Sequence, residues 1–86
     1  KIIPVRRSDL DMNKHVNNAR YLEWMEEPLN EGQIYRTNKV DIIFLRESVY
    51  GDTITSQIKA AEQASTFHQL KNQRDEIIAL ASFSDI

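Results

Sequence analysis

Hydrophobic and polar residues alternate along the second half of the chain with the two-residue period that is typical of β-strands. Residues 53–60, 66–70 and 77–83 show this alternation, and polar turns separate them. Residues 39–47 are rich in branched and aromatic side chains, which also favours a strand. The pattern therefore predicts four antiparallel strands, the last three joined as consecutive hairpins.

The first half of the chain combines a strand, a polar loop and one helix. Residues 2–7 predict the strand, and residues 8–15 predict a loop because Asp and Asn side chains compete with regular backbone pairing. A helix capped by Asn17 or Asn18 is expected to run until Pro28 ends it. Its apolar residues cover a wide arc, which indicates burial by a sheet. The expected fold is α+β, with an antiparallel sheet of about five strands wrapped around one central helix.

Composition narrows the possible function classes. The 86 residues, 41% hydrophobic and 28% charged, have the make-up of one small domain. A net charge of -2 without a basic run argues against a nucleic-acid partner. The longest apolar run, residues 42–45, is far shorter than the roughly 20 residues of a membrane-spanning helix. We therefore expect a cytoplasmic protein with neither a nucleic-acid nor a membrane partner.

The chain begins at Lys1, without a methionine, and enters its first predicted strand directly. We therefore expect residues 1–86 to be one domain of a longer polypeptide. A domain of this size buries only roughly 60 to 70% of the surface that its unfolded chain exposes, so it is expected to pack against a partner. No repeat or flexible linker divides it.

Residues 9–18 form the densest group of candidate functional side chains, with two carboxylates, three amides and one imidazole between a strand and a helix. The alternative interpretation is a loop whose Asp and Asn side chains bind turn backbone and cap the helix. No metal site is expected, because the loop has a single His and the chain has no Cys. A Ser-His-Asp triad is not favoured either, since no Gly-x-Ser-x-Gly motif is present.

Two stretches carry a resemblance to a known family. Residues 8–18 read Ser-Asp-Leu-Asp-Met-Asn-Lys-His-Val-Asn-Asn, and residues 21–24 read Tyr-Leu-Glu-Trp. Together they resemble the catalytic hotdog domain of acyl-acyl carrier protein thioesterases. Hotdog acyl-CoA thioesterases share a looser pattern with Gly where this chain has Asn13, which favours the carrier-protein group. Residues 44–48 resemble that family's strand with a catalytic acidic residue, and residues 51–52 resemble its following turn.

The resemblance implies catalytic roles for four residues, which are Asp11, Asn13, His15 and Glu47. Many plant relatives have Cys where this chain has Ser48, and without a thiol the attacking group must be water or a carboxylate. We prefer Glu47 as the general base that activates water, with Asn13 and His15 orienting water or thioester and Asp11 holding them in place. The reverse assignment, with Asp11 as the base, stays open.

Further expectations concern substrate binding and partners. Backbone amides near Val16, Asn17 and Asn18 are expected to bind the thioester oxygen, because a helix N-terminus favours negative charge. The resemblance implies that residues 1–86 are the carboxyl-terminal part of a double-hotdog chain. Its partners would be acyl carrier protein and a second hotdog domain, in the same chain or in a homodimer. The substrate carries its own phosphopantetheine, so no cofactor is expected, and a plant protein would lie in the plastid.

Two other functions remain open, a self-pairing acyl-CoA thioesterase and a non-catalytic acyl-binding hotdog module.

Side chains outside the motif are expected to have structural rather than catalytic roles. His68 is expected to face solvent, and the basic residues near the motif, such as Arg7 and Lys14, are expected to be a solvated surface rather than a carrier-protein site. Core packing is favoured over an acyl pocket for four residues, which are Tyr21, Trp24, Met25 and Phe44.

Overall fold

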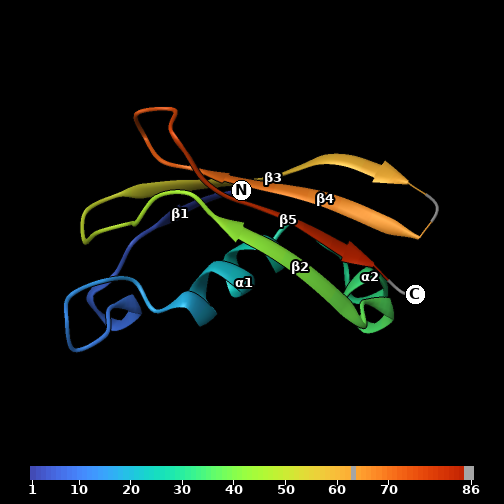
Figure 1. The fold of residues 1–86 in the computed structure, drawn as a ribbon, viewed down its shortest axis with the longest axis horizontal. Helices are drawn as coiled ribbons and strands as arrows, with labels where there is room; N and C mark the ends of the chain where they lie inside the picture. Colours follow the sequence, from blue (N-terminus) through green and yellow to red (C-terminus); the bar gives the residue numbers. More distant parts are fainter. Residues whose placement is uncertain (63, 85–86) are drawn as a thin grey trace.

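Within residues 1–62 and 64–84, which the computed structural model describes, five antiparallel strands form one sheet in the order β1-β3-β4-β5-β2 (Figure 1). The expected domain, 1–86, also includes positions 63, 85 and 86, which lie outside the described residues. The strands are β1 (Ile2–Pro4), β2 (Lys39–Phe44), β3 (Thr53–Glu62), β4 (Ser65–Lys71) and β5 (Ile77–Ser84). Two α-helices, α1 (Asn18–Glu26) and α2 (Glu31–Arg36), and a 3-10 turn (Arg7–Asp9) complete the fold.

The long helix α1 packs against one face of this sheet, as Figure 1 shows. Asn17 is its cap, because the Asn17 side chain accepts a hydrogen bond from the Ala19 backbone N–H at 3.0 Å. Tyr21, Trp24 and Met25 on α1 are buried. They join a core with inward-facing strand residues, which include Ile54, Leu70, Ala79, Ala81 and Phe83. The expected α+β class, with a five-stranded antiparallel sheet around one long helix, is confirmed.

Two strands are shorter than the sequence pattern predicts. The first ends at Pro4 rather than at residue 7, because the Arg6 backbone N–H donates to the Asp9 carboxylate at 2.8 Å and the chain turns into the 3-10 helix. The strand expected over residues 39–47 ends at Phe44. Beyond it, two successive backbone N–H groups, of Leu45 and Arg46, donate to the same carbonyl, that of Ile78. The regular ladder stops there, and Glu47 lies in the segment after the strand.

A second helix occupies a segment in which the sequence pattern predicted neither a helix nor a strand. Helix α2 begins with a reciprocal capping box. The Gln33 N–H donates to Asn30 Oδ1 at 2.8 Å, and the Asn30 N–H donates to Gln33 Oε1 at 2.9 Å. Asn followed three residues later by Gln is a recognised signal for a helix start. It was present in the sequence, so this difference is a missed signal rather than a tertiary effect.

His68 is buried, with 2% of its surface exposed, and the expectation that it faces solvent is wrong. The alternation of β4 places His68 on the same inward face as Leu70. Its Nε2 lies 2.7 Å from the Thr66 hydroxyl, and its ring centre lies 4.3 Å from that of Phe83. Burial lowers the pKa of His68 from its usual 6.5. A polar contact to the Met25 backbone offsets only part of this lowering of the pKa.

The buried imidazole predicts a loss of stability in acid. Because folding lowers the pKa of His68, the unfolded chain binds the proton more readily than the folded chain does. The stabilisation is therefore complete above the unfolded pKa of about 6.5 and is lost as the pH falls through the folded pKa. We expect the urea midpoint to fall between about pH 7.5 and about pH 5. The substitution His68→Gln should reduce this difference, whereas His15→Gln should retain it. An unchanged pH dependence in His68→Gln would contradict the assignment.

Candidate functional site

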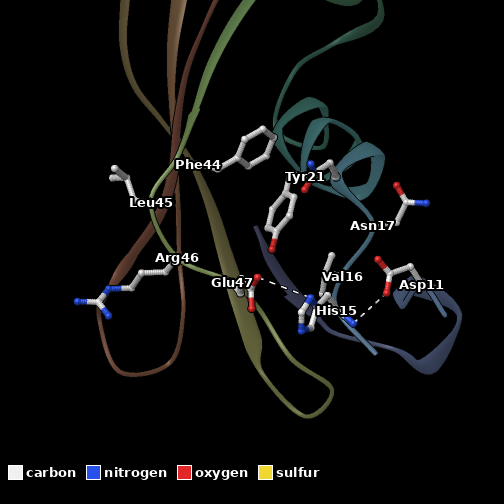
Figure 2. Close-up of a pocket in the computed structure, with 10 residues that line it drawn as sticks. Asp11, His15, Val16, Asn17, Tyr21, Phe44, Leu45, Arg46 and Glu47 are labelled. Carbon is white, nitrogen blue, oxygen red and sulfur yellow. Dashed lines mark hydrogen bonds and ion pairs between the residues drawn. The ribbon is translucent and has the colours of Figure 1, made fainter. Parts of the chain in front are cut away.

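A groove of about 660 Å³ opens between the loop before α1, the first turns of α1 and the segment after β2 (Figure 2). Two segments that are distant in sequence therefore form its two walls. Every expected site residue except Asn13 lines it. The full lining is Asp11, His15, Val16, Asn17, Asn18, Tyr21, Phe44, Leu45, Arg46 and Glu47.

His15 and Glu47 meet across this groove. The distance between His15 Nδ1 and Glu47 Oε1 is 3.6 Å, and Figure 2 shows the two side chains directed toward each other. Both side chains are more than half exposed, at 52% and 71%. An exposed pair of this kind contributes little to stability, so its importance is geometric. It brings a proton-accepting carboxylate next to an imidazole at a place that substrate can reach.

Asp11 organises the loop through its backbone. Asp11 Oδ1 accepts hydrogen bonds from the backbone N–H groups of Asn13, at 2.9 Å, and His15, at 3.1 Å. The Asp11 N–H in turn donates to the His15 carbonyl at 2.7 Å. Lys14 closes the turn with a φ of 64°, in the left-handed region. The carboxylate therefore shapes the turn that presents His15, while the Asn13 side chain is exposed outside the groove.

Asp9, to which the sequence interpretation gave no role, anchors the whole loop. Its side chain is fully buried, and besides the Arg6 backbone it lies 3.5 Å from Arg20 Nε on α1. The Asp9 carbonyl accepts the Asn17 N–H at 2.9 Å. Arg20 also donates to Glu23 at 2.8 Å, and this hydrogen bond, together with the smaller effect of Asp9, raises the pKa of Arg20. Asp9 thus ties both ends of the loop to the start of α1.

The amides at the helix start are only partly available to a substrate. The Asn17 N–H donates to the Asp9 carbonyl, and the Ala19 N–H donates to the Asn17 side chain. The Asn17 amide is therefore already used within the protein, whereas Asn17 itself still lines the groove. The N–H of Asn18 belongs to the first turn of α1, where intrahelical partners are lacking. It is the better placed candidate for an oxyanion, next to the buried Val16.

The other wall of the groove is held by contacts from the sheet and from α1. Arg46 Nη1 lies 3.3 Å from Glu76, so it does not pair with Glu47. The Ser48 backbone N–H donates to the Tyr21 hydroxyl at 3.1 Å in a buried position. Phe44 was expected in the core but is 43% exposed at the groove.

Among the described residues, no helix is long and apolar enough to cross a membrane. In the same part of the chain, no three acidic, His or Cys side chains gather as a metal site would require.

Comparison with known proteins places this fold and motif in a family. The family model described as acyl-ACP thioesterase C-terminal domain matches residues 1–84. A chloroplastic oleoyl-acyl carrier protein thioesterase of Coriandrum sativum is 41% identical over 54 residues, which are 59% of this chain and 14% of that protein. Oleoyl-acyl carrier protein thioesterase 1 of Arabidopsis thaliana is also 41% identical over 54 residues, with 59% and 15% covered. The chain thus spans about a seventh of these relatives.

Solved structures show the same architecture. An acyl-ACP thioesterase from Bacteroides thetaiotaomicron superposes with a TM-score of 0.88 at 20% identity, over 98% of this chain and 35% of that one. An oleoyl thioesterase from Lactobacillus plantarum superposes with a TM-score of 0.79 at 31% identity, over 96% and 35%. The family that the sequence motif resembled is therefore confirmed. By the match over residues 1–84, the chain belongs to the family of acyl-ACP thioesterase C-terminal domains.

Proposed function

We propose that this domain supplies the catalytic residues of a thioesterase that hydrolyses fatty acyl-acyl carrier protein to free fatty acid and carrier thiol. The single observation that supports this most strongly is the contact of His15 with Glu47 across the groove, at 3.6 Å. Base-assisted hydrolysis needs a carboxylate or imidazole where water and a thioester can meet. The named activity of the plant relatives, oleoyl-acyl carrier protein thioesterase, supports the choice of substrate.

In the proposed reaction Glu47 is the general base. It takes a proton from water, the water oxygen forms a bond to the thioester carbon, and the carbon–sulfur bond breaks. The sulfur leaves as a thiolate and receives the proton from Glu47, and this step is undemanding because thiols are good leaving groups. His15 orients the carboxylate or the water, and Asp11 fixes the turn that carries His15. Asn13, exposed on the same loop, stays a candidate for orienting water or thioester.

We also propose that residues 1–86 work against a second hotdog domain, in the same chain or in another copy. In the described residues β2 pairs with β5 on one side, and its other edge is open. Apolar side chains at and after this edge are exposed, with 61% for Ile43, 43% for Phe44 and 52% for Leu45. An open apolar edge strand favours pairing with another sheet. The groove adjoins this edge, so a partner there would complete its wall.

Hydrolysis of matched thioesters by the complete natural protein tests the proposal. The same acyl group is offered on acyl carrier protein and on CoA, and released thiol is measured. We expect turnover without added metal or cofactor and a higher kcat/KM for the carrier-protein thioester. A preference for CoA would instead identify an acyl-CoA thioesterase. Binding of both thioesters without thiol release would identify a non-catalytic acyl-binding module.

A further inference from the structure

Tyr21 is held in the wall of the groove by ring packing and by a hydrogen bond to its hydroxyl. It lies on α1, is 3% exposed and lines the groove. Its ring packs edge-on against Trp24 and Phe44, with ring centres 5.4 and 5.3 Å away. These contacts prevent the ring from swinging. Figure 2 shows its hydroxyl directed toward the part of the groove where Glu47 and His15 meet.

The hydrogen bonding of this hydroxyl leaves its proton available. The Tyr21 oxygen accepts the Ser48 backbone N–H at 3.1 Å. A phenol can accept such a bond and still donate its own proton to another group. None of the hydrogen bonds found among the described side chains uses that proton. The hydroxyl proton can rotate about the C–O bond, so it is free to be donated to a group on the side that the Ser48 N–H does not occupy.

Hydrolysis of a thioester needs a donor at this place. Negative charge develops on the carbonyl oxygen during attack, and fixed donors aimed at that oxygen stabilise it. Two amides at the start of α1 are already used, since Asn17 donates to Asp9 and Ala19 donates to the Asn17 side chain. The Asn18 N–H is left there as a donor, and a second donor would share the charge with it. The Tyr21 hydroxyl is a neutral donor held by both walls of the groove, so little reorganisation would accompany the reaction.

We propose that Tyr21 is a further catalytic residue, whose hydroxyl donates a hydrogen bond to the carbonyl oxygen of the bound thioester. This inference rests on the proposed thioesterase function. The bond strengthens as the oxygen becomes negative, and the Ser48 N–H, by donating to the same hydroxyl, makes it a better donor. Tyr21 also links α1 to the residue after Glu47, which ties the donor to the segment that carries the base.

The substitution Tyr21→Phe in the complete natural protein tests the kinetic consequence. The ring packing is retained, so the variant is expected to fold, and we expect kcat to fall roughly a hundredfold, as when one oxyanion donor is lost. Tyr50→Phe is the matched control, because Tyr50 is exposed and does not line the groove. It should retain full activity. Equal kcat in the unaltered protein and in Tyr21→Phe would overturn the proposal.

Two substrate analogues separate direct contact from a structural role. In one, a methylene replaces the thioester sulfur and the carbonyl remains; in the other, a methylene replaces the carbonyl. Tyr21→Phe should weaken binding of the carbonyl analogue roughly five- to tenfold and leave the second unchanged. Equal weakening of both, or of neither, would overturn the proposal. If the unaltered protein hydrolyses no thioester, the proposed function fails, while this binding comparison still decides the role of Tyr21.

Discussion

Replacing Glu47 by Gln in the complete natural protein is expected to lower kcat for thioester hydrolysis by roughly two to four orders of magnitude, because an amide cannot take a proton from water. The substitution retains the size of the side chain and a hydrogen-bonding oxygen near His15. Glu47 is 71% exposed and its contact with His15 is 3.6 Å, so the fold should be unaffected. Release of carrier thiol under single-turnover conditions measures the chemical step directly.

Two further variants make this result specific. Glu26→Gln removes an exposed carboxylate of α1 outside the groove and should leave kcat unchanged. Asp11→Asn retains the oxygen that accepts the Asn13 and His15 N–H groups, so the loop should keep its shape. If Glu47 is the base, Asp11→Asn should retain most of the activity. A large loss in Asp11→Asn together with near-normal turnover in Glu47→Gln would assign the base to Asp11 instead.

Local signals in the sequence were sufficient for most of the fold. Alternation in the second half predicted three strands, which the structure extends only by a few residues at their ends. Asn17 was one of two candidate caps, and its side chain does accept the Ala19 N–H. Helix α1 ends at Glu26, just before Pro28. These features depend on nearest neighbours along the chain, which is why a single sequence contains them.

Features that depend on distant partners could not be read in the same way. The end of β2 at Phe44 is set by the carbonyl of Ile78 on β5, which accepts the N–H groups of the two residues that follow β2. His68 lies between Phe67 and Gln69 in the sequence, and the pairing of β4 with β5 turns it toward Phe83. The alternation of a strand predicts which residues share a face, but the partners of the strand decide which face meets the core.

The candidate site shows the same division. The loop motif marked His15, and the resemblance to a family marked Glu47, but their contact needs the loop and the segment after β2 to converge. The importance of Asp9 arises from its burial and from its contact with Arg20 in the first turn of α1, neither of which the sequence reveals. Tyr21 was interpreted as core, and it is buried, but the sequence does not reveal that its hydroxyl reaches Ser48.

Truncating Met25 to Ala is expected to lower the free energy of unfolding by about 2 to 5 kcal/mol. Met25 is completely buried between α1 and the sheet, so the substitution removes apolar contacts and leaves a cavity. A loss of this size is a large fraction of the roughly 5 to 15 kcal/mol that stabilises a typical domain. Because α1 carries Tyr21 and the start of the groove, its detachment from the sheet would also separate His15 from Glu47. Urea unfolding followed by circular dichroism measures the change.

The chain contains its own control for this experiment. Its other methionine, Met12, is fully exposed in the loop, so Met12→Ala should change stability by no more than about 0.5 kcal/mol. Met25→Leu conserves volume and should cost less than about 1.5 kcal/mol. A small effect of Met25→Ala, close to that of Met12→Ala, would contradict the packing of α1. The contrast between the two methionines would show that the helix bearing the groove is held by burial on the sheet.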